Sequence, residues 1–454
     1  MPAPTSTTKP APLKVAIVGA GPGGLAAAIQ FRRLPDVELS VYDQARELRE
    51  VGAGIALNQN SWRQLRELGA AEDISQYHTR QTEDKVSVEQ RIGRTGELIY
   101  QRKVSGNPDQ PPAVRIERTV LQRALLNRLP KDLVQLSKKL DHYTETDAGV
   151  TLTFKDGTTA GPFDLVIGAD GIRSAVRHQA YPDHQLSYTG KVAFRVLIPQ
   201  ERVAHLEGIP QAATWWHTPD THVYTLPLDN GQFEIATRAI EDEAHGQKVS
   251  WGQIVQDSSR VKAHYTGYTK LIRDIIDTVQ DGEWQEFALF GGPLLPNVTR
   301  GGRIVLIGDA SHPLSGAFGS GAAFAFEDAF VLAKVVEFAR AQGKTQAFAL
   351  DLFDDIRQPR FEYLYSVLNH GGANLKAVRD EKLEPDAHVK EVIRRNWAGE
   401  GRKPGDQGDQ IYAYNVQEVW AARERDELEK AAKVAKPVEV EKVTEQLAAV
   451  AVAA

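Results

Sequence analysis

Two kinds of hydrophobic periodicity alternate along the chain. Residues 14–20 (KVAIVGA) form a short apolar run that ends at glycines, residues 23–34 show helical spacing, and residues 37–42 form a second apolar run. Short apolar runs are typical of buried strands, so this order indicates a strand–helix–strand unit. Strand-like runs return far downstream, at residues 164–169 and 303–307. The pattern predicts an α/β domain assembled from distant parts of the chain.

A different pattern lies between these runs. Residues 191–198, 211–228 and 232–238 alternate polar and apolar positions and are rich in aromatic and β-branched side chains. This pattern is typical of antiparallel strands with one buried face. Helical spacing follows from Gly321 to about Gly343, and again over residues 350–370. We therefore expect a mainly antiparallel sheet inserted into the α/β domain.

These patterns predict three parts. The expected ranges are a discontinuous nucleotide-binding domain at 13–80, 110–180 and 295–370, a substrate-binding sheet domain at 81–109 and 181–294, and a helical C-terminal extension at 371–454 with a partly disordered end. The segment before residue 13 is rich in Pro, Thr and Ser and is expected to be a disordered lead-in. We interpret the tail from Trp420 as a helix followed by a frayed end, in preference to a partner-binding helix.

Composition excludes several classes of function. The net charge of -6 gives no basic field for nucleic acid or an anionic membrane. No apolar run approaches the ~20 residues that span a bilayer. The chain has 454 residues and no cysteine, which excludes disulfides and thiolate chemistry, and no metal-ligand spacing is seen. We expect a soluble cytoplasmic protein, a monomer or homodimer, without a metal, nucleic-acid or membrane partner.

The first strand ends in a dinucleotide-binding fingerprint. Residues 19–24 read GAGPGG, so Gly19 permits a tight turn, Gly21 lets the backbone approach a pyrophosphate, and Gly24 allows close helix packing. The helix N-terminus presents free N–H groups to the anion. Asp43 ends the second strand, where its carboxylate can accept hydrogen bonds from ribose hydroxyls. The sequence therefore predicts a dinucleotide site.

Two later motifs favour FAD over NAD. In residues 168–177 (GADGIRSAVR) a strand ends at Asp170, and Ser174 can cap the next helix. In residues 308–313 (GDASHP) a strand delivers Asp309 to a position suited to ribityl hydroxyls, and a glycine segment then opens a helix at Gly321. The positive end of that helix can face a reduced flavin, and it stabilises an adjacent anion by roughly 0.3–2 kcal/mol.

The three motifs in this order resemble those of the class A flavoprotein monooxygenases, in particular the salicylate hydroxylase-like branch. The resemblance covers roughly residues 13–370. It implies a Rossmann-like FAD-binding domain of the p-hydroxybenzoate hydroxylase type. It also implies FAD as cofactor, NADH or NADPH as a transient co-substrate, and hydroxylation of a small phenolic or aromatic acid by O2 through a flavin C4a-hydroperoxide, with or without decarboxylation.

The same resemblance assigns further cofactor contacts. Residues 51–56 (VGAGIA), with Ala56, match the family's glycine–alanine segment beside the flavin, and Arg118 matches an arginine that typically contacts FAD. Ala322 matches the first helical residue near the flavin ring. In that family, Asp170 belongs to the motif associated with FAD and nicotinamide, and Asp309 to the one at the ribityl chain.

The chain also departs from the family. Gly316, Ser320 and Ala323 stand where the family often has Pro, Gln and Asn. We expect the FAD site to tolerate these changes, because backbone amides supply its contacts.

Three residues of the inserted sheet are candidates for substrate chemistry. Arg195 is a charge inside an apolar strand and suits binding of a carboxylate or phenolate; the alternative is an outward-facing arginine. Its position matches an arginine of related phenol hydroxylases. His222 and Tyr224 share one strand face and suit relay of a phenolic proton, although either residue can simply pack.

Five further polar and aromatic residues are interpreted as structural, as pocket wall or as undecided between structure and function. His312 is expected to be structural, Trp215 and Trp216 to form core or pocket wall, and His217 and Arg238 were compatible with either role. Rival functions are a flavin reductase or oxidase without ring hydroxylation and a non-catalytic flavin-binding protein. A flavin-dependent halogenase is disfavoured because its G-W-x-W-x-I-P signature is absent.

Overall fold

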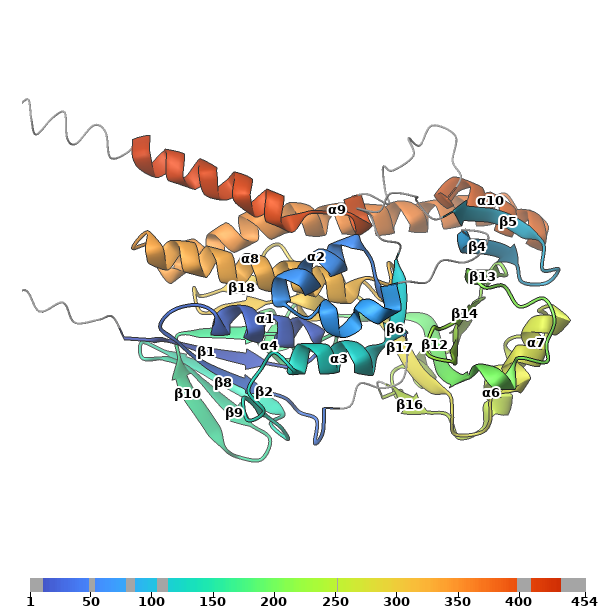
Figure 1. Cartoon of the computed structure of the whole chain (residues 1–454), viewed down its shortest axis with the longest axis horizontal. Helices are drawn as coiled ribbons and strands as arrows, with labels where there is room; N and C mark the ends of the chain where they lie inside the picture. The colour runs from blue at the N-terminus through green and yellow to red at the C-terminus, as the bar shows by residue number, and fades with distance from the viewer. Residues whose placement is uncertain are drawn as a thin grey trace, which may run out of the picture.

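The computed structural model describes residues 11–48, 54–78, 86–103, 113–250, 252–397 and 410–433. It contains a Rossmann-like α/β domain, a large mainly antiparallel sheet and a helical C-terminal region (Figure 1). The predicted fold class is confirmed.

A six-stranded sheet forms the centre of the first domain. Its order is β18 (Thr299–Arg300), β19 (Ile304–Leu306), β11 (Leu165–Gly168), β1 (Leu13–Val18), β2 (Val37–Tyr42) and β7 (Val134–Gln135). All neighbours are parallel except β18 and β19. Because β1, β2, β11 and β19 run in the same direction, their carboxyl ends reach one edge of the sheet, where α/β proteins bind ligands.

Helices and smaller sheets surround this sheet. α1 (Pro22–Arg32) packs against α8 (Gly321–Ala341), and both lie in the main apolar core. The remaining elements are α2 (Gln59–Leu68), η1 (Glu72–His78), α3 (Arg118–Leu126), α4 (Ala175–Ala180), η3 (Gly308–Ala310), a two-stranded sheet of β3 (Gly54–Leu57) and β6 (Val114–Glu117), and a three-stranded sheet of β8 (Leu140–Thr146), β9 (Gly149–Phe154) and β10 (Thr159–Phe163).

An eight-stranded sheet forms the second domain. Its order is β16 (Gln253–Ile254), β17 (Gln285–Gly291), β12 (Ser187–Pro199), β15 (Gln232–Ile240), β14 (His222–Pro227), β13 (Ala213–His217), β4 (Val86–Ile92) and β5 (Leu98–Lys103). The helices η2 (Gln200–Arg202), α5 (Glu243–Gly246), α6 (Ser258–Ala263) and α7 (Lys270–Asp277) complete it. Alternate residues such as Phe194, Ile235 and Val223 form a buried core with α6 and α7, so the other face is free to line a site.

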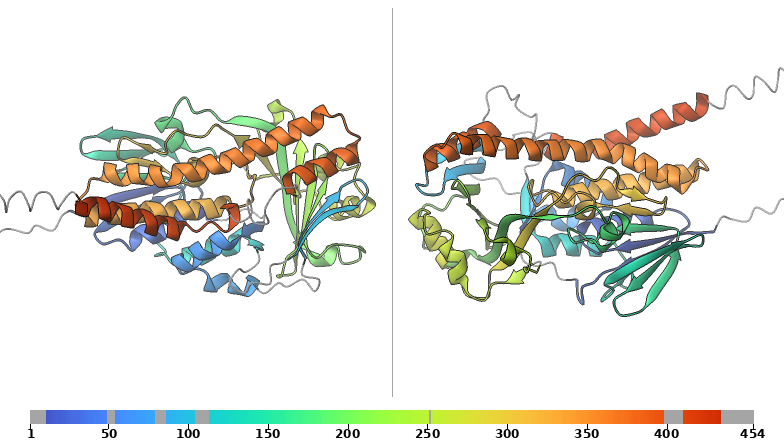
Figure 2. Two further views of the ribbon diagram at one scale, coloured as in Figure 1. Left: turned by 90° about the horizontal axis from the view of Figure 1, so that it is seen from above. Right: turned by 180° about the vertical axis from the view of Figure 1, so that it is seen from behind.

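The C-terminal region connects the two domains. The long helix α9 (Gln346–Asp380) runs from α8 towards the eight-stranded sheet, and α10 (Pro385–Trp397) packs against β4 and β5 (Figures 1 and 2). A helix over residues 416–433 then lies back along α8, where Trp420 contacts Phe338. The predicted frayed end from residue 434 lies outside the described residues. In the part of the chain that the structure describes, no helix is long and apolar enough to cross a membrane.

Candidate active site

One large cavity, of about 1090 Å³, lies between the two domains. The carboxyl ends of the parallel strands and one face of the eight-stranded sheet form its walls. Every predicted site residue except Gly24 lines it, namely Arg195, His222, Tyr224, Gly19, Gly21, Asp43, Ala56, Arg118, Asp170, Asp309, Gly321 and Ala322. The fold thus brings candidates for cofactor and substrate binding into one chamber.

The fingerprint turn has the geometry that a pyrophosphate requires. Gly19 has a φ of +103°, and a Cβ there would lie 2.4 Å from the carbonyl oxygen of Ala169. A Cβ on Gly24 would lie 1.9 Å from the carbonyl oxygen of Gly19, which explains why this glycine packs the helix but does not face the cavity. Apart from Gly21 and its chain neighbours, no residue that the structure describes has an atom within 4 Å of the position that a Cβ on Gly21 would occupy. This open space lets an anion approach the first-turn amides of α1.

The loop of the second motif is fixed by its own backbone. The Asp170 carboxylate accepts hydrogen bonds from Ser174 Oγ at 2.5 Å and from the Ala175 amide at 2.7 Å. Ser174 in turn caps α4 by accepting from the Arg177 amide at 2.9 Å, as the sequence predicted. Burial raises the pKa of Asp170 despite these hydrogen bonds.

Buried Arg177 joins the second motif to the third. Its guanidinium donates to the carbonyl oxygens of Asp309 at 3.1 Å and Ala310 at 3.0 Å, and to that of Ile172. The two carboxylates delivered by β11 and β19 are therefore held in a fixed relation to each other.

Asp309 faces the cavity beside the start of α8. Its Oδ1 lies 3.5 Å from the position that a Cβ on Gly321 would occupy. Burial raises the pKa of Asp309, whereas electrostatic interactions with His312, Arg118 and Arg177 lower it. With the open turn at Gly21, a carboxylate suited to ribityl hydroxyls and the α8 N-terminus aimed at the same chamber, the donor set fits FAD.

The opposite wall is the uncovered face of the eight-stranded sheet. Along β12, Ala193 and Arg195 line the cavity, whereas Phe194 and Val196 enter the core under α6 and α7. This is the period-two alternation of a strand. Arg195 is thus not an outward-facing surface arginine.

Arg195 lies in the cavity, and no carboxylate of the residues that the structure describes forms an ion pair with it. Its guanidinium carbon lies 5.4 Å from the ring centroid of Phe287, and among the described residues its Nε is buried with no hydrogen-bond partner. Burial, followed by the neighbouring Arg115 and Arg118, lowers the pKa of Arg195 to about 9. The side chain remains charged near pH 7, and an anion beside it would be favourable.

His222 and Tyr224 project from β14 into the same chamber. The Tyr224 ring packs against Trp215 with ring centroids 4.6 Å apart, and the Arg115 guanidinium lies 4.9 Å from the Tyr224 ring centroid. Burial, followed by Arg238, His217 and Lys191, lowers the pKa of His222 well below its ordinary value. His222 is therefore a neutral imidazole near pH 7.

Three of the remaining candidates, Trp215, His217 and Arg238, line the cavity, and Trp216 lies in the core. Trp215 forms cavity wall, whereas Trp216 lies in the core and donates from Nε1 to Thr225 Oγ1 at 3.1 Å. His217 lines the cavity with Nε2 2.5 Å from Gln90 Oε1, and burial lowers its pKa to about 4. Arg238 also lines the cavity and donates to the Gly316 carbonyl oxygen at 3.2 Å.

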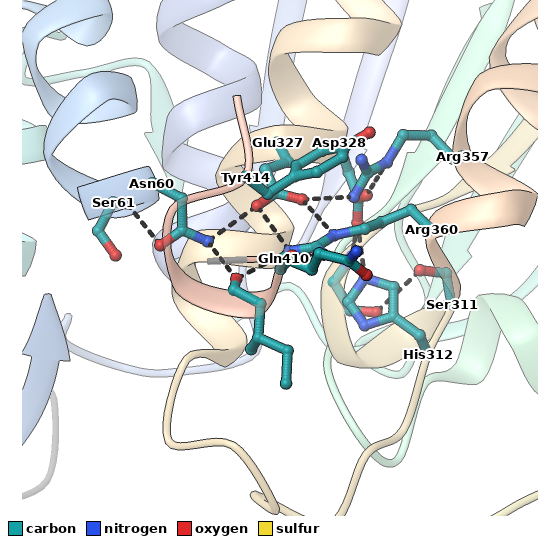
Figure 3. A network of polar contacts seen from close by, with 12 residues as sticks. Asn60, Ser61, Ser311, His312, Glu327, Asp328, Arg357, Arg360, Gln410 and Tyr414 are labelled. Atoms are coloured by element: carbon teal, nitrogen blue, oxygen red, sulfur yellow. Dashed lines mark hydrogen bonds and ion pairs between the residues drawn. The ribbon is translucent and has the colours of Figure 1, made fainter. Parts of the chain in front are cut away.

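His312 lies deeper, behind the strand ends. Its ring is fully buried against Phe361, and Nε2 lies 2.8 Å from Asp328 Oδ2 (Figure 3). The same carboxylate oxygen accepts from the Gly308 amide at 2.8 Å. His312 therefore shapes the turn that carries Asp309, which agrees with the structural role expected for it.

A buried ion pair at the domain junction was missed in the sequence. Arg115 on β6 donates two hydrogen bonds to Glu234 on β15, one of them at 2.7 Å, and Glu234 also accepts from the Gly54 amide at 3.0 Å. Glu234 is fully buried. The pair ties the β3–β6 sheet beside the cofactor motifs to the sheet that carries Arg195. Only the charge of Glu234 inside an apolar strand could have indicated it.

Comparisons with known proteins agree with this geometry. The chain is 28% identical over 370 residues to a salicylate hydroxylase from Pseudomonas putida, covering 77% of this chain and 82% of that protein. It is 30% identical over 360 residues to a 3-amino-4-hydroxybenzoate 2-monooxygenase from Streptomyces platensis, covering 78% of this chain and 86% of that protein. A solved salicylate hydroxylase–substrate complex has the same fold, with a TM-score of 0.71 at 21% identity, and the alignment covers 90% of this chain and 98% of that chain.

The family match covers most of the chain. Residues 12–366 match the FAD binding domain family, a stretch that contains all three cofactor motifs and the eight-stranded sheet. The chain therefore belongs to the FAD binding domain family and is an FAD-dependent aromatic monooxygenase, related to the salicylate hydroxylases.

Proposed function

We propose that this enzyme hydroxylates a small aromatic acid that carries a phenolic group, using NADH or NADPH and O2. The observation that carries the proposal is Arg195, a charged guanidinium in an apolar cavity wall without a described carboxylate partner. Bound FAD supplies the redox chemistry that activates oxygen. The protein side chains bind the ring, exclude water and handle the phenolic proton.

Arg195 is assigned to the substrate carboxylate or phenolate. Glu234, which raises the pKa of Arg195, is already paired with Arg115, so it leaves the Arg195 charge available. A planar guanidinium can bind a carboxylate through two parallel hydrogen bonds. The apolar walls formed by Phe287, Leu289 and Ala193 would then contact the ring edge.

His222 and Tyr224 are assigned to the phenolic hydroxyl. Both lie on the cavity face of β14, and the neutral His222 can accept a hydrogen bond from the phenol. Ring hydroxylation is favoured by electron density at the ring, which rises as the phenol loses its proton. His222→Gln and Tyr224→Phe should therefore lower kcat more than they raise KM.

The relatives support an aromatic acid but not one compound. One relative is a 3-amino-4-hydroxybenzoate 2-monooxygenase and another is a salicylate hydroxylase. We therefore extend the proposal to hydroxybenzoates as a class and leave open hydroxylation with loss of the carboxylate. Formation of a catechol with CO2 from salicylate, as opposed to a dihydroxybenzoate, would distinguish the two outcomes.

The test is a substrate screen of the yellow holoenzyme. Hydroxybenzoates, amino-hydroxybenzoates and N-heteroaromatic acids are compared with the corresponding neutral phenols, with NADH and NADPH oxidation and product formation measured together. We expect acids to be turned over and neutral phenols to be poor substrates. NAD(P)H oxidation that yields only peroxide with every acid would instead indicate the reductase or oxidase alternative.

Arg195→Ala tests directly whether Arg195 binds the anionic group of the substrate. Loss of one partner of a buried charge pair costs roughly 2–5 kcal/mol, so kcat/KM for the acid should fall by about 30-fold or more while FAD stays bound. Arg195→Lys should recover part of the loss. Arg202→Ala is the matched control, because Arg202 pairs with Glu283 away from the cavity. Unchanged turnover of the acid by Arg195→Ala would refute the assignment.

A further inference from the structure

Part of the cavity wall comes from the C-terminal extension, beyond the family match. Tyr412 and Ala413 line the cavity, although the match ends at residue 366. We call residues 410–414 the C-terminal segment. It follows α9 and α10 in the chain but returns to the first domain, next to α2 and α8 (Figure 3).

Buried polar side chains hold this segment by its backbone. Arg360 on α9 pairs with Glu327 on α8 and also donates to the carbonyl oxygens of Gln410 and, at 3.0 Å, Ile411 (Figure 3). Asn60 Nδ2 lies 2.9 Å from Glu327 Oε1 and 3.3 Å from the Ile411 oxygen. A buried donor that lost its acceptor would be costly, so these contacts fix the position of the segment.

Contacts from Arg63 and Arg360 fix the end of the segment that lines the cavity. Arg63 on α2 donates to the carbonyl oxygens of Ala413 at 2.5 Å and Tyr414 at 3.1 Å. The Arg360 guanidinium also lies 4.0 Å from the ring centroid of Tyr414, a distance at which a cation attracts an aromatic face. Tyr412, between these anchors, is thereby aimed at the cavity rather than at solvent.

Tyr412 reaches the loop that precedes α8. Its hydroxyl donates to the Phe318 carbonyl oxygen at 3.3 Å, and its ring packs against a cluster that contains Leu314 and Phe324. The loop, residues 314–320, lies between Asp309 and Gly321, and its residues 314–319 line the cavity. It contains Ser315, Gly316 and Gly319 at φ values of 52°, 67° and 63°. Such backbone is not fixed by regular secondary structure, so outside contacts decide where it lies.

The other contacts to this loop come from the cavity walls. Ser315 Oγ donates to the Phe290 carbonyl oxygen at 2.5 Å, Arg238 donates to the Gly316 carbonyl oxygen at 3.2 Å, and Asn58 Nδ2 donates to Ser320 Oγ at 2.7 Å. Tyr412 supplies a further contact, at Phe318. It is the one loop anchor named here that comes from outside residues 12–366.

We propose that Tyr412 is a positioning residue for the flavin-side loop 314–320, and that the C-terminal segment completes the wall which shields the bound FAD from solvent. The inference concerns the chain's contact with FAD and does not depend on which aromatic acid is the substrate. It makes the C-terminal extension a component of the active site, where the sequence suggested only a helix with a frayed end.

The test uses full-length holoenzyme without substrate. The FAD dissociation constant and the quenching of bound-flavin fluorescence by iodide are measured for Tyr412→Ala, Tyr412→Phe and wild type. Tyr412→Ala should raise the iodide quenching constant at least about twofold and weaken FAD binding by about 2- to 10-fold, the size expected for one hydrogen bond with its packing.

Tyr412→Phe keeps the ring and should fall between Tyr412→Ala and wild type. Tyr181→Phe, which loses a hydroxyl bonded to Asn297 and Thr299 outside the cavity, is the control.

A second variant separates the segment from the cavity itself. Arg63→Gln removes contacts to Ala413 and Tyr414 without changing a cavity-lining side chain. It should increase iodide quenching in the same direction, and its effect should be less than additive with Tyr412→Phe, because both act through the same segment. If Tyr412→Ala does not fold, Tyr412→Phe and Arg63→Gln decide the matter. Wild-type quenching and FAD affinity in the folded variants would overturn the proposal.

Discussion

The two walls of the cavity satisfy their charges in different ways. On the cofactor side, the carboxylate of Asp43 accepts hydrogen bonds from the amides of Ala20 and Ala45, both at 2.7 Å, and Asp170 is bonded to Ser174 and Ala175. On the sheet side, Arg195 extends over Phe287, with no carboxylate partner among the residues described.

This difference separates a preorganised wall from one that awaits a ligand. Local backbone contacts fix the cofactor-side carboxylates before any ligand binds, so a substitution there should act on folding or on FAD. Under the proposed assignment Arg195 binds an anionic substrate, so a substitution there should act on the substrate and spare FAD.

The largest effect is expected from Gly24, the last glycine of the fingerprint. Gly24→Ala places a Cβ 1.9 Å from the Gly19 carbonyl oxygen, so the turn or helix α1 must move. Overpacking costs about 1–3 kcal/mol where neighbouring side chains can adjust. A backbone carbonyl cannot adjust in this way, so Gly24→Ala should cost more than any other substitution described here, lower the Tm of the apoprotein and prevent FAD uptake. Thermal unfolding of the apoprotein and its flavin content after reconstitution measure both effects.

Gly21→Ala is the matched variant. Its Cβ meets no protein atom within 4 Å, and Gly21 has a φ of -68°, which any residue adopts. The apoprotein should therefore keep the wild-type Tm, while FAD binds more weakly because the new methyl group occupies space needed by the pyrophosphate. Equal losses of apoprotein stability in the two variants would contradict the assigned geometry.

The junction between the walls should give the next largest effect. Glu234→Ala leaves Arg115 buried without its partner, and breaking a buried pair in this way costs about 3–5 kcal/mol. Urea unfolding of the apoprotein measures the loss. Glu283→Ala provides the comparison, because it breaks the partly exposed pair with Arg202 and should cost about 1 kcal/mol or less. Similar losses in both variants would show that the Arg115–Glu234 pair is not a structural tie.

The same contrast explains what could be predicted from the sequence. The strands at 14–20, 37–42, 164–169 and 303–307 were predicted close to β1, β2, β11 and β19, because each joins an apolar run to a glycine or carboxylate turn. Such turns need particular residues at particular spacings. The cofactor wall therefore leaves a local signal in the sequence.

The wall formed by the eight-stranded sheet and the C-terminal region depend on contacts between distant residues, which leave no local pattern in the sequence. The alternation along β14 placed His222 and Tyr224 on one face, but the Arg115–Glu234 pair joins residues 119 positions apart. Helix α9 also continues through Pro359, which lacks an N–H, because Ile356, Arg357, Arg360 and Phe361 are buried around it. Tertiary packing, and not local preference, decides these features.

The smallest effect concerns the pH dependence of stability on the substrate side. Burial lowers the pKa of His217 to about 4, and His222, Arg238 and Lys191 lie in the same part of the sheet. The unfolded chain takes up a proton near pH 6.5, whereas the folded protein does so only near pH 4, so this histidine makes the folded state less stable as the pH falls between these values. The contribution is present in full above about pH 6.5 and is lost progressively below it.

His217→Gln should reduce this sensitivity, because an amide does not titrate and can still contact Gln90. From linkage, the fall in the free energy of unfolding between pH 7.5 and pH 5 should be smaller than in wild type by up to about 2 kcal/mol. Urea unfolding of the apoprotein at both pH values gives the difference, and His205→Gln, at an exposed position, controls for loss of a histidine. Parallel falls in His217→Gln and wild type would mean that His217 is protonated equally in the folded and unfolded states. The sheet wall would then be wetter than its buried imidazoles indicate, and the contrast with the cofactor wall would weaken.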